Sequence, residues 1–274
     1  MERTTEKRNP KAARLSSMPI REILELVSDE DATVPAAVRR AIPEIERAVE
    51  LIVASLGRGG HLRYVGAGTS GRLGVLDASE MPPTFGVDPD MVAGVIAGGD
   101  HALRMSIEGA EDQPVGIRDL RDRFVPGDVV VGISASGRAP YVVDAIENAK
   151  RDLGASATIA ITCNRDSALA RAADVAIVVD VGPEVIAGSS RMKAGTATKL
   201  VLNMLSTTAM VKLGRTRDDL MVDLRASNEK LRQRAIHMVQ TEANIGADEA
   251  KARLERWGWH VRAAIEDRWP AASS

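Results

Sequence analysis

The stretch Arg63-Tyr64-Val65-Gly66-Ala67-Gly68-Thr69-Ser70-Gly71 decides the fold that we expect for this chain. A β-type run ends there in glycines, and the residues that follow are predicted to open a helix. The backbone N–H groups in the first turn of a helix have no intrahelical partner, and the helix dipole is positive at that end. The stretch is therefore a candidate anion site at the end of a strand.

Two further segments rich in Gly, Ser and Thr have the same character. Ser134-Ala135-Ser136-Gly137 follows the apolar run Val129–Ile133, and a longer segment extends from Gly188 to Thr196. Serine hydroxyls in all three segments would add donors that suit phosphate or sugar oxygens. The expected ligand is a phosphorylated sugar or a molecule of similar chemistry.

The chain contains five β-branched runs with helical patterns between them. Apolar strands that alternate with helices predict an α/β fold, with a doubly wound, mainly parallel five-stranded sheet sandwiched by helices. Ligands of such folds bind at the carboxyl ends of the strands, but the order of the strands cannot be read from the sequence. The five runs are His61–Gly66, Val92–Ala97, Asp128–Ile133, Ala157–Cys163 and Asp174–Asp180.

Helical patterns flank the five runs on both sides. Apolar residues at helical spacing predict helices over 20–27 and 34–56, and a long apolar helix over 194–213 that is buried or packed against another subunit. Charged, alanine-rich helices begin near residue 227 and indicate a small bundle. We therefore expect an N-terminal helical segment that packs on the core (1–56), an α/β domain (57–226) and a C-terminal helical bundle (227–274).

The composition excludes several classes of protein. Among 274 residues, 36 Lys and Arg balance 38 Asp and Glu, so there is no reason to expect a nucleic-acid or membrane partner. No apolar stretch is long enough to span a bilayer, and the charged start resembles no signal peptide. The single cysteine, Cys163, excludes an internal disulfide, and the four histidines lack the spacing of metal ligands. We expect a cytoplasmic protein that needs no metal.

The pattern Gly66-x-Gly68-x-x-Gly71 also formally matches a dinucleotide-binding fingerprint. That interpretation needs an acidic residue roughly 20 positions on, after the next strand. Asp88 and Asp90 precede that strand here, and Asp100 follows about 30 positions on. The glycines could also serve a tight turn alone. The three segments together favour a phosphate site over both alternatives.

Two carboxylates are candidates for acid/base chemistry. Glu80 precedes Met81-Pro82-Pro83 and is expected at a helix C-terminus, where the dipole disfavours negative charge and favours a proton donor. Glu111 is expected where a helix gives way to a loop at Pro114. Either could be an ordinary surface carboxylate. A helix from Ser70 to Glu80 spans about 15 Å, so Glu80 would reach the ligand only across a crevice or a subunit boundary.

Six longer strings contain these motifs: Thr5-Glu6-x-Arg8-Asn9-Pro10, Tyr64–Gly74, Asp77–Gly86, Glu108–Asp112, Gly132–Arg138 and Glu184–Thr196. Together they resemble the N-acetylmuramic acid 6-phosphate etherases, bacterial enzymes of the sugar isomerase (SIS) superfamily. The resemblance runs from residue 5 to about residue 230, and the C-terminal bundle resembles the family's helical tail more loosely.

The resemblance implies a SIS fold and a lyase reaction without a cofactor. The D-lactyl ether at C3 of N-acetylmuramic acid 6-phosphate would be cleaved by elimination across C2 and C3 and then hydration. The products would be N-acetylglucosamine 6-phosphate and D-lactate, in the recycling of cell-wall amino sugars. Carried over by motif, Glu80 is the proton donor to the lactate oxygen and Glu111 the second acid/base residue. The long apolar helix and the position of Glu80 also predict a homodimer with interfacial active sites.

The same resemblance and the three segments define the expected substrate contacts. Glu184 is a reserve candidate for ring opening or chemistry at C2, with a structural hydrogen-bond acceptor as the alternative. Arg191 and Lys193 could instead be solvated surface residues. The expected substrate-binding residues are Gly68, Thr69, Ser70, Ser134, Ser136, Gly137, Glu184, Ser189, Ser190 and Lys193.

Two other functions remain open from the sequence. A sugar-phosphate isomerase on the same fold would need only one acid/base carboxylate and would release no lactate. A non-catalytic sugar-phosphate sensor would resemble the glucokinase regulatory protein, which shares the string Gly188-Ser189-Ser190-Arg191-Met192-Lys193. That regulator is longer and contains two SIS domains, whereas this chain has room for one.

Overall fold

The computed structural model describes residues 4–224, 226 and 228–267. Its contacts divide the chain into two compact units. The sheet unit comprises Met1–Ser79 and Asp90–Ala209, and the C-terminal unit comprises Glu80–Pro89 and Met210–Ser274. The predicted division into residues 1–56, 57–226 and 227–274 remains a prediction. By contacts, residues 1–56 group with the sheet, and residues 80–89 and 210–226 group with the C-terminal helices.

The centre of the sheet unit is a five-stranded sheet in which every neighbouring pair is parallel, as predicted. The strand order is β2-β1-β3-β4-β5, so β3 lies in the middle. β1 and β3 are buried along their whole length, which explains their continuous apolar runs. The strands are β1 Leu62–Gly66, β2 Val92–Ile96, β3 Val129–Ile133, β4 Ala157–Thr162 and β5 Val175–Val178.

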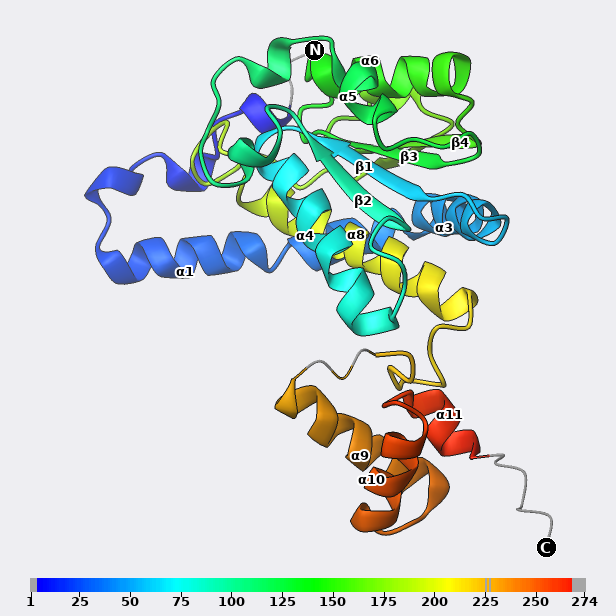
Figure 1. Ribbon diagram of the computed structural model, residues 1–274. Coiled ribbons are helices and arrows are strands. Elements are labelled where there is room, and N and C mark those ends of the chain that lie inside the picture. The colour runs from blue at the N-terminus through cyan, green and yellow to red at the C-terminus, as the bar shows by residue number, and fades with distance from the viewer. Residues whose placement is uncertain (1–3, 225, 227, 268–274) are drawn as a thin grey trace, which may run out of the picture. The chain divides into compact units, whose positions relative to one another are not determined.

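Helices cover both faces of this sheet (Figure 1). One face packs against α5 (Gly116–Arg121), α6 (Pro140–Asn148) and α7 (Ala168–Ala172), and its core includes Val130 and Ile146. The other face is covered by α3 (Ile42–Leu56), the first part of α4 (Gly68–Phe85) and most of α8 (Lys193–Lys212). The predicted doubly wound α/β sandwich is therefore confirmed.

The N-terminal helices differ from the prediction in one respect. A single helix over 34–56 is wrong, because the chain forms α2 (Val34–Arg40) and α3 with a break at Ala41. Pro43 lies in the first turn of α3, where a missing N–H is tolerated, but inside a continuous helix it would interrupt the hydrogen-bond ladder. The helix α1 (Ile20–Asp31) precedes them, after short 3₁₀ turns at Thr4–Glu6, Pro10–Ala12 and Leu15–Ser17.

The helix α4 also continues beyond its predicted end. Placing Glu80 at a helix C-terminus is wrong, because α4 runs through Pro82 and Pro83 to Phe85. It ends at Gly86, which has a φ of +63° and whose N–H bonds to the carbonyl of Pro82 at 3.0 Å. The dipole of a helix end acts within its last turn, so it provides no argument for a proton donor at Glu80.

The C-terminal unit contains the predicted small helical bundle. Its helices are α9 (Glu229–Ala243), α10 (Ala247–Arg256) and α11 (Val261–Glu266). They bury a separate apolar core that includes Val239 and Leu254, and the Arg232 guanidinium lies 5.0 Å from the centre of the Trp259 ring. The C-terminal unit therefore has an apolar core that is separate from the core of the sheet unit.

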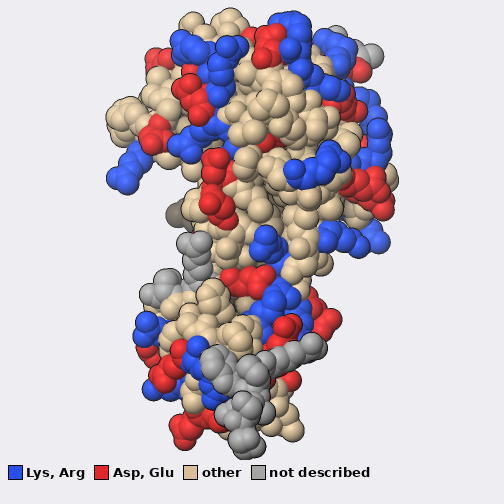
Figure 2. Space-filling model, turned by 45° about the vertical axis from the view of Figure 1, so that its right-hand side comes forward, with Lys and Arg blue, Asp and Glu red and all other residues tan. Residues whose placement is uncertain are grey.

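The surface carries charges of both signs, as the balanced numbers of basic and acidic residues predict. In Figure 2, Lys and Arg side chains are interspersed with Asp and Glu side chains over the visible face. Within the described ranges, no helix is both long and apolar enough to cross a membrane.

Candidate active site

The strand order places a crevice between β1 and β3. From β1 the chain continues through α4 to β2 on one side, and from β3 it continues through α6 to β4 on the other. Such a reversal in direction opens a crevice at the carboxyl ends of the two strands, where α/β proteins bind ligands. The first two Gly/Ser-rich segments follow β1 and β3 directly, so the fold brings them together.

A cavity of about 410 Å³ lies at this crevice, within the size range of small-molecule sites. All three predicted segments contribute to its wall, together with one predicted carboxylate. The predicted residues that line it are Gly68, Thr69, Ser70, Ser134, Ser136, Ser190 and Glu111. The remaining expected site residues, Gly137, Ser189, Glu184, Lys193 and Glu80, are not among its lining residues.

The loop after β3 holds two hydroxyls close together. The Oγ atoms of Ser134 and Ser136 lie 3.4 Å apart, and the N–H of Gly137 donates to the Ser134 Oγ at 3.2 Å. Gly137 has a φ of +66°, and a Cβ there would lie 2.7 Å from the Thr162 Oγ1. Only glycine suits that position, so Gly137 shapes the loop from which the two serines face the cavity.

The start of α4 supplies backbone donors to the same cavity. Gly68 opens the helix with a φ of +53°, and the first-turn N–H groups of Thr69 and Ser70 have no partner within the helix. A Cβ on Gly71 would lie 2.8 Å from the carbonyl oxygen of Gly66, so the helix start packs closely on the end of β1. The glycine pattern therefore serves a close strand-to-helix turn that aims N–H groups at the cavity.

Glu111 brings a carboxylate to these donors. It lies in the 3₁₀ turn Ala110–Asp112, is exposed, and lines both this cavity and an adjoining one of about 240 Å³. Ala110 packs against the core face that contains α6, which holds the turn beside the loop after β3. A carboxylate beside hydroxyl and N–H donors can accept or return a proton on a bound sugar.

The third segment divides into a part that lines the cavity and a part that is buried. Gly188 and Ser190 line the cavity, whereas Glu184 is buried and accepts the N–H groups of Lys193 and Ala194, both at 3.0 Å. This is the geometry of a structural hydrogen-bond acceptor, which caps the start of α8. The Nζ of Lys193 lies 2.6 Å from a carboxylate oxygen of Glu30, and both side chains are buried.

Glu80 does not take part in the cavity described here. Its side chain is exposed on α4 and belongs by contacts to the C-terminal unit. The described lining of this cavity therefore does not bring the Glu80 carboxylate to a bound substrate.

Among the polar and charged residues that line the cavity, sequence reasoning did not assign Thr5, Glu6, Asp112 and Arg138. Thr5 and Glu6 reach it because the first 3₁₀ turn lies near the loop after β4, where the Asn164 amide donates to the Thr5 Oγ1 at 3.3 Å. Arg138 is the only Lys or Arg among the described lining residues. Two signals in the sequence could have identified them. Thr5 and Glu6 belong to one of the strings that resemble the family, and Arg138 is the residue directly after Gly137.

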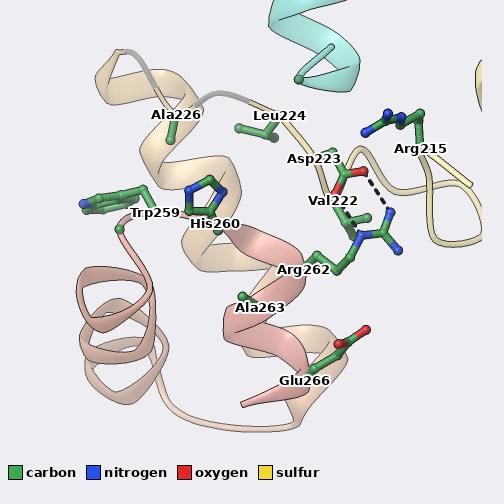
Figure 3. A pocket seen from close by; sticks show the side chains of 12 residues that line it. Arg215, Val222, Asp223, Leu224, Ala226, Trp259, His260, Arg262, Ala263 and Glu266 are labelled. Carbon is green, nitrogen blue, oxygen red and sulfur yellow. Dashed lines mark hydrogen bonds and ion pairs between the residues drawn. The ribbon is translucent and has the colours of Figure 1, made fainter. Parts of the chain in front are cut away.

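A larger cavity, of about 1000 Å³, lies in the C-terminal unit (Figure 3). Asp223 and Arg262 form a two-point ion pair there, at 2.8 and 3.0 Å, and Arg262 also donates to the carbonyl of Gly214 at 2.8 Å. The rest of its wall mixes apolar and charged side chains, such as Val222 and Glu266. This lining indicates no single class of ligand.

Cys163 is buried in the sheet unit. Burial raises the pKa of the Cys163 thiol to about 12, with smaller contributions from the charges of Glu184 and Asp180, so this thiol is not a ready nucleophile. In the part of the chain that the structure describes, no group of three or more His, Cys, Asp or Glu residues is placed to hold a metal ion.

Comparison with known proteins agrees with the fold. The model of the glucokinase regulatory protein N-terminal SIS domain matches residues 44–150, and that of the SIS domain matches residues 119–208. A solved structure of a candidate phosphosugar isomerase involved in capsule formation, from Bacteroides fragilis, has a TM-score of 0.54 with 22% identity. That match covers 73% of this chain and 95% of the other. At this identity, the likeness establishes the fold alone.

Sequence relatives identify the family. An N-acetylmuramic acid 6-phosphate etherase of Symbiobacterium thermophilum is 55% identical over 262 residues, which is 95% of this chain and 87% of that protein. The etherase of Streptomyces coelicolor is 52% identical over 264 residues, which is 96% of this chain and 84% of that protein. From this identity over nearly the whole chain, together with the SIS fold, we conclude that the chain belongs to the N-acetylmuramic acid 6-phosphate etherase family.

Proposed function

We propose that this protein cleaves the D-lactyl ether of N-acetylmuramic acid 6-phosphate, in the recycling of cell-wall amino sugars. The products are N-acetylglucosamine 6-phosphate and D-lactate. The observation that supports this most directly is one cavity in which the three Gly/Ser-rich segments and Glu111 meet. Membership of the etherase family supports the choice of substrate.

The cavity offers separate groups to the two anionic ends of this substrate. The hydroxyls of Ser134 and Ser136 and the first-turn N–H groups of α4 suit the oxygens of the 6-phosphate. Arg138 suits the lactyl carboxylate, because it is the only cationic side chain among the described lining residues. Binding at both ends would hold C2 and C3 of the sugar near Glu111.

The reaction we propose is a lyase reaction followed by hydration. In the open-chain form the aldehyde acidifies the proton on C2, and a base removes it. An acid protonates the ether oxygen as the bond from C3 to that oxygen breaks, which releases D-lactate and leaves a double bond between C2 and C3. Water then returns a hydroxyl to C3 and a proton to C2. Each acid/base group typically contributes about 100- to 10,000-fold.

We assign Glu111 and Glu80 to these proton transfers. Since Glu80 is not among the cavity's lining residues, we propose that it acts at a site shared with a second copy of the chain. Exposed apolar side chains on the sheet unit, Leu24, Leu76 and Met204, would be covered in such a homodimer. Light scattering that finds a stable, active monomer would refute the shared site.

We also propose a cytoplasmic location and no nucleic-acid partner. The net charge of −2 and the mixed surface charges in Figure 2 support this part of the proposal.

The test is the release of D-lactate from N-acetylmuramic acid 6-phosphate by purified protein. Glu111→Gln and Glu80→Gln should each lower kcat by about 100- to 10,000-fold, since a glutamine cannot exchange the proton. Glu46→Gln is the control, because Glu46 is an exposed carboxylate on α3. If either glutamate variant keeps wild-type turnover, that assignment is wrong.

Isotopes separate the proposed route from other ways of breaking the ether. In D₂O, elimination and hydration put deuterium on C2 of the sugar product. In H₂¹⁸O they put ¹⁸O on C3 and none in the lactate hydroxyl. Direct displacement at C3 would leave C2 unlabelled. Interconversion of sugar phosphates without lactate would indicate an isomerase, and binding without turnover would indicate a sensor.

A further inference from the structure

Three charged and polar side chains, two buried and one exposed, surround the buried carboxylate of Glu30 on α1. One oxygen, Oε2, accepts a hydrogen bond from the Nδ2 of Asn9 at 2.9 Å and another from the Nζ of Lys193 at 2.6 Å. The other, Oε1, accepts the Nζ of Lys11 at 2.9 Å. Asn9, Glu30 and Lys193 are 7%, 6% and 2% exposed, so three polar side chains share one interior site. We call Asn9, Lys11, Glu30 and Lys193 the Glu30 cluster.

The Glu30 cluster joins two segments that both reach the cavity. Asn9 and Lys11 belong to residues 4–12, here called the N-terminal arm, which also contains the cavity-lining residues Thr5 and Glu6. Lys193 opens α8, directly after the loop whose Gly188 and Ser190 line the cavity. Glu30 therefore links two parts of the cavity wall that are more than 170 residues apart in sequence.

The arm and the loop also lie close to each other at the cavity. A carboxylate oxygen of Glu6 lies 3.7 Å from the position that a Cβ on Gly188 would take. Thr5 is held in turn by the Asn164 amide, which also donates to the carbonyl of Ala135 in the loop after β3. The first turn of the arm thus lies close to Gly188 and is linked through Asn164 to the loop after β3.

The energetics of the Glu30 cluster favour a fixed arrangement. Burial would raise the pKa of Glu30, but hydrogen bonds and charge from Lys193 and Lys11 outweigh it, so the pKa lies below its ordinary value. A buried ion pair is costly to break, because the partner that remains is left charged and uncompensated. Lys193 is accordingly held by Glu30, with its side chain away from the cavity wall.

We propose that Glu30 is a positioning residue for the etherase reaction. It holds the N-terminal arm through Asn9 and the loop 188–192 through Lys193, so that Thr5, Glu6 and Ser190 close one side of the cavity around the bound sugar. This inference rests on the proposed function for its kinetic consequence. The attachment of the arm to Glu30 can be measured without any turnover.

The test uses two variants of the Glu30 cluster and one matched control in the full-length protein. Asn9→Leu removes the buried link between the arm and Glu30, and it leaves the exposed link from Lys11 and the pair of Glu30 and Lys193 in place. Glu30→Gln weakens the links to the arm and to Lys193, and it also leaves Lys193 without its carboxylate, so this variant could fail to fold. Glu25→Gln is the control, because Glu25 lies on the same helix and forms only an exposed ion pair with Arg21.

Three readouts are taken on each protein. A spin label attached through Lys7→Cys reports the mobility of the arm, since Lys7 is exposed and the natural Cys163 is buried. Kinetics of D-lactate release give KM and kcat separately, and thermal unfolding gives Tm. We expect Asn9→Leu to mobilise the label and to lower kcat/KM by about 10- to 100-fold. Most of this loss should be in KM, because the arm forms cavity wall and supplies neither of the assigned proton-transfer groups.

The outcomes separate a positioning role from a merely structural one. A mobile label with unchanged KM would overturn the proposal, because the arm would then not shape the site. A lower Tm with an immobile label and unchanged KM would also overturn it, because the cluster would only stabilise the fold. Failure of the wild type to release D-lactate would instead refute the proposed function, whatever the label shows.

Discussion

The substitution Arg138→Met tests how the cavity recognises its substrate. Arg138 directly follows the loop after β3, where its N–H donates to the Ser136 Oγ at 3.3 Å, and its side chain is exposed at the cavity. The other charged residues that line this cavity are the carboxylates Glu6, Glu111 and Asp112. An anionic substrate group therefore has one cationic side chain to approach within the described lining.

The size of the effect follows from this single charge. A hydrogen bond to a charged group contributes about 1.5–3 kcal/mol, and each 1.4 kcal/mol is a factor of ten in affinity. If Arg138 binds the lactyl carboxylate, Arg138→Met should raise the KM for N-acetylmuramic acid 6-phosphate by about 10- to 150-fold. We expect little change in kcat, because this contact is made equally before and during the reaction.

The assay compares a ligand that has the carboxylate with one that lacks it. The KM is measured from the release of D-lactate, and the Ki is measured for the product N-acetylglucosamine 6-phosphate, which has the phosphate but no lactyl group. Arg165→Met is the control, because Arg165 is an exposed arginine that lines a neighbouring cavity of about 300 Å³ and not the site cavity.

Two results would refute the reasoning. An equal loss for substrate and product would mean that Arg138 binds the phosphate, and no loss for either would mean that it contacts no anionic group. A rise in KM with an unchanged Ki is the result that we expect.

Three further predictions concern the interior of the sheet unit. Burial raises the pKa of the Asp77 carboxyl above its unfolded value, so its ionisation costs stability as the pH rises. Asp77→Asn should therefore match wild type at about pH 4 and be about 1 kcal/mol more stable at higher pH, because its neutral amide has no ionisation cost. Urea unfolding at both pH values checks this, and no pH dependence of the difference would contradict it. Gly71→Ala should lower the free energy of unfolding by about 1–3 kcal/mol in urea, because the new Cβ would meet the backbone of Gly66; unchanged stability would contradict the close approach. Cys163 should resist iodoacetamide at pH 8 in the folded protein and react after unfolding, and rapid labelling of the folded chain would show that the thiol is accessible.

Part of the site could be predicted from sequence because its signals are local. The runs that became β1 to β5 alternate with helices, and each Gly/Ser-rich segment lies within a few residues of a strand or helix end. Backbone conformation and the burial of neighbouring residues depend largely on such short-range patterns. Two predictions were wrong at prolines. The predicted helix over 34–56 ran through Pro43, which instead lies in the first turn of a new helix, and the predicted helix end at Glu80 relied on Pro82 and Pro83, which α4 accommodates.

The sequence by itself therefore determined the class of fold, the three Gly/Ser-rich segments that contribute to the cavity, and the family. Only the tertiary structure decided the order β2-β1-β3-β4-β5, which places two of those segments at one crevice. It also decided that Thr5 and Glu6 line the cavity and that Lys193 is paired with Glu30 inside the protein. The physical reason is that contacts between residues far apart in the chain depend on how whole elements pack, and no local pattern specifies which distant partner a side chain meets.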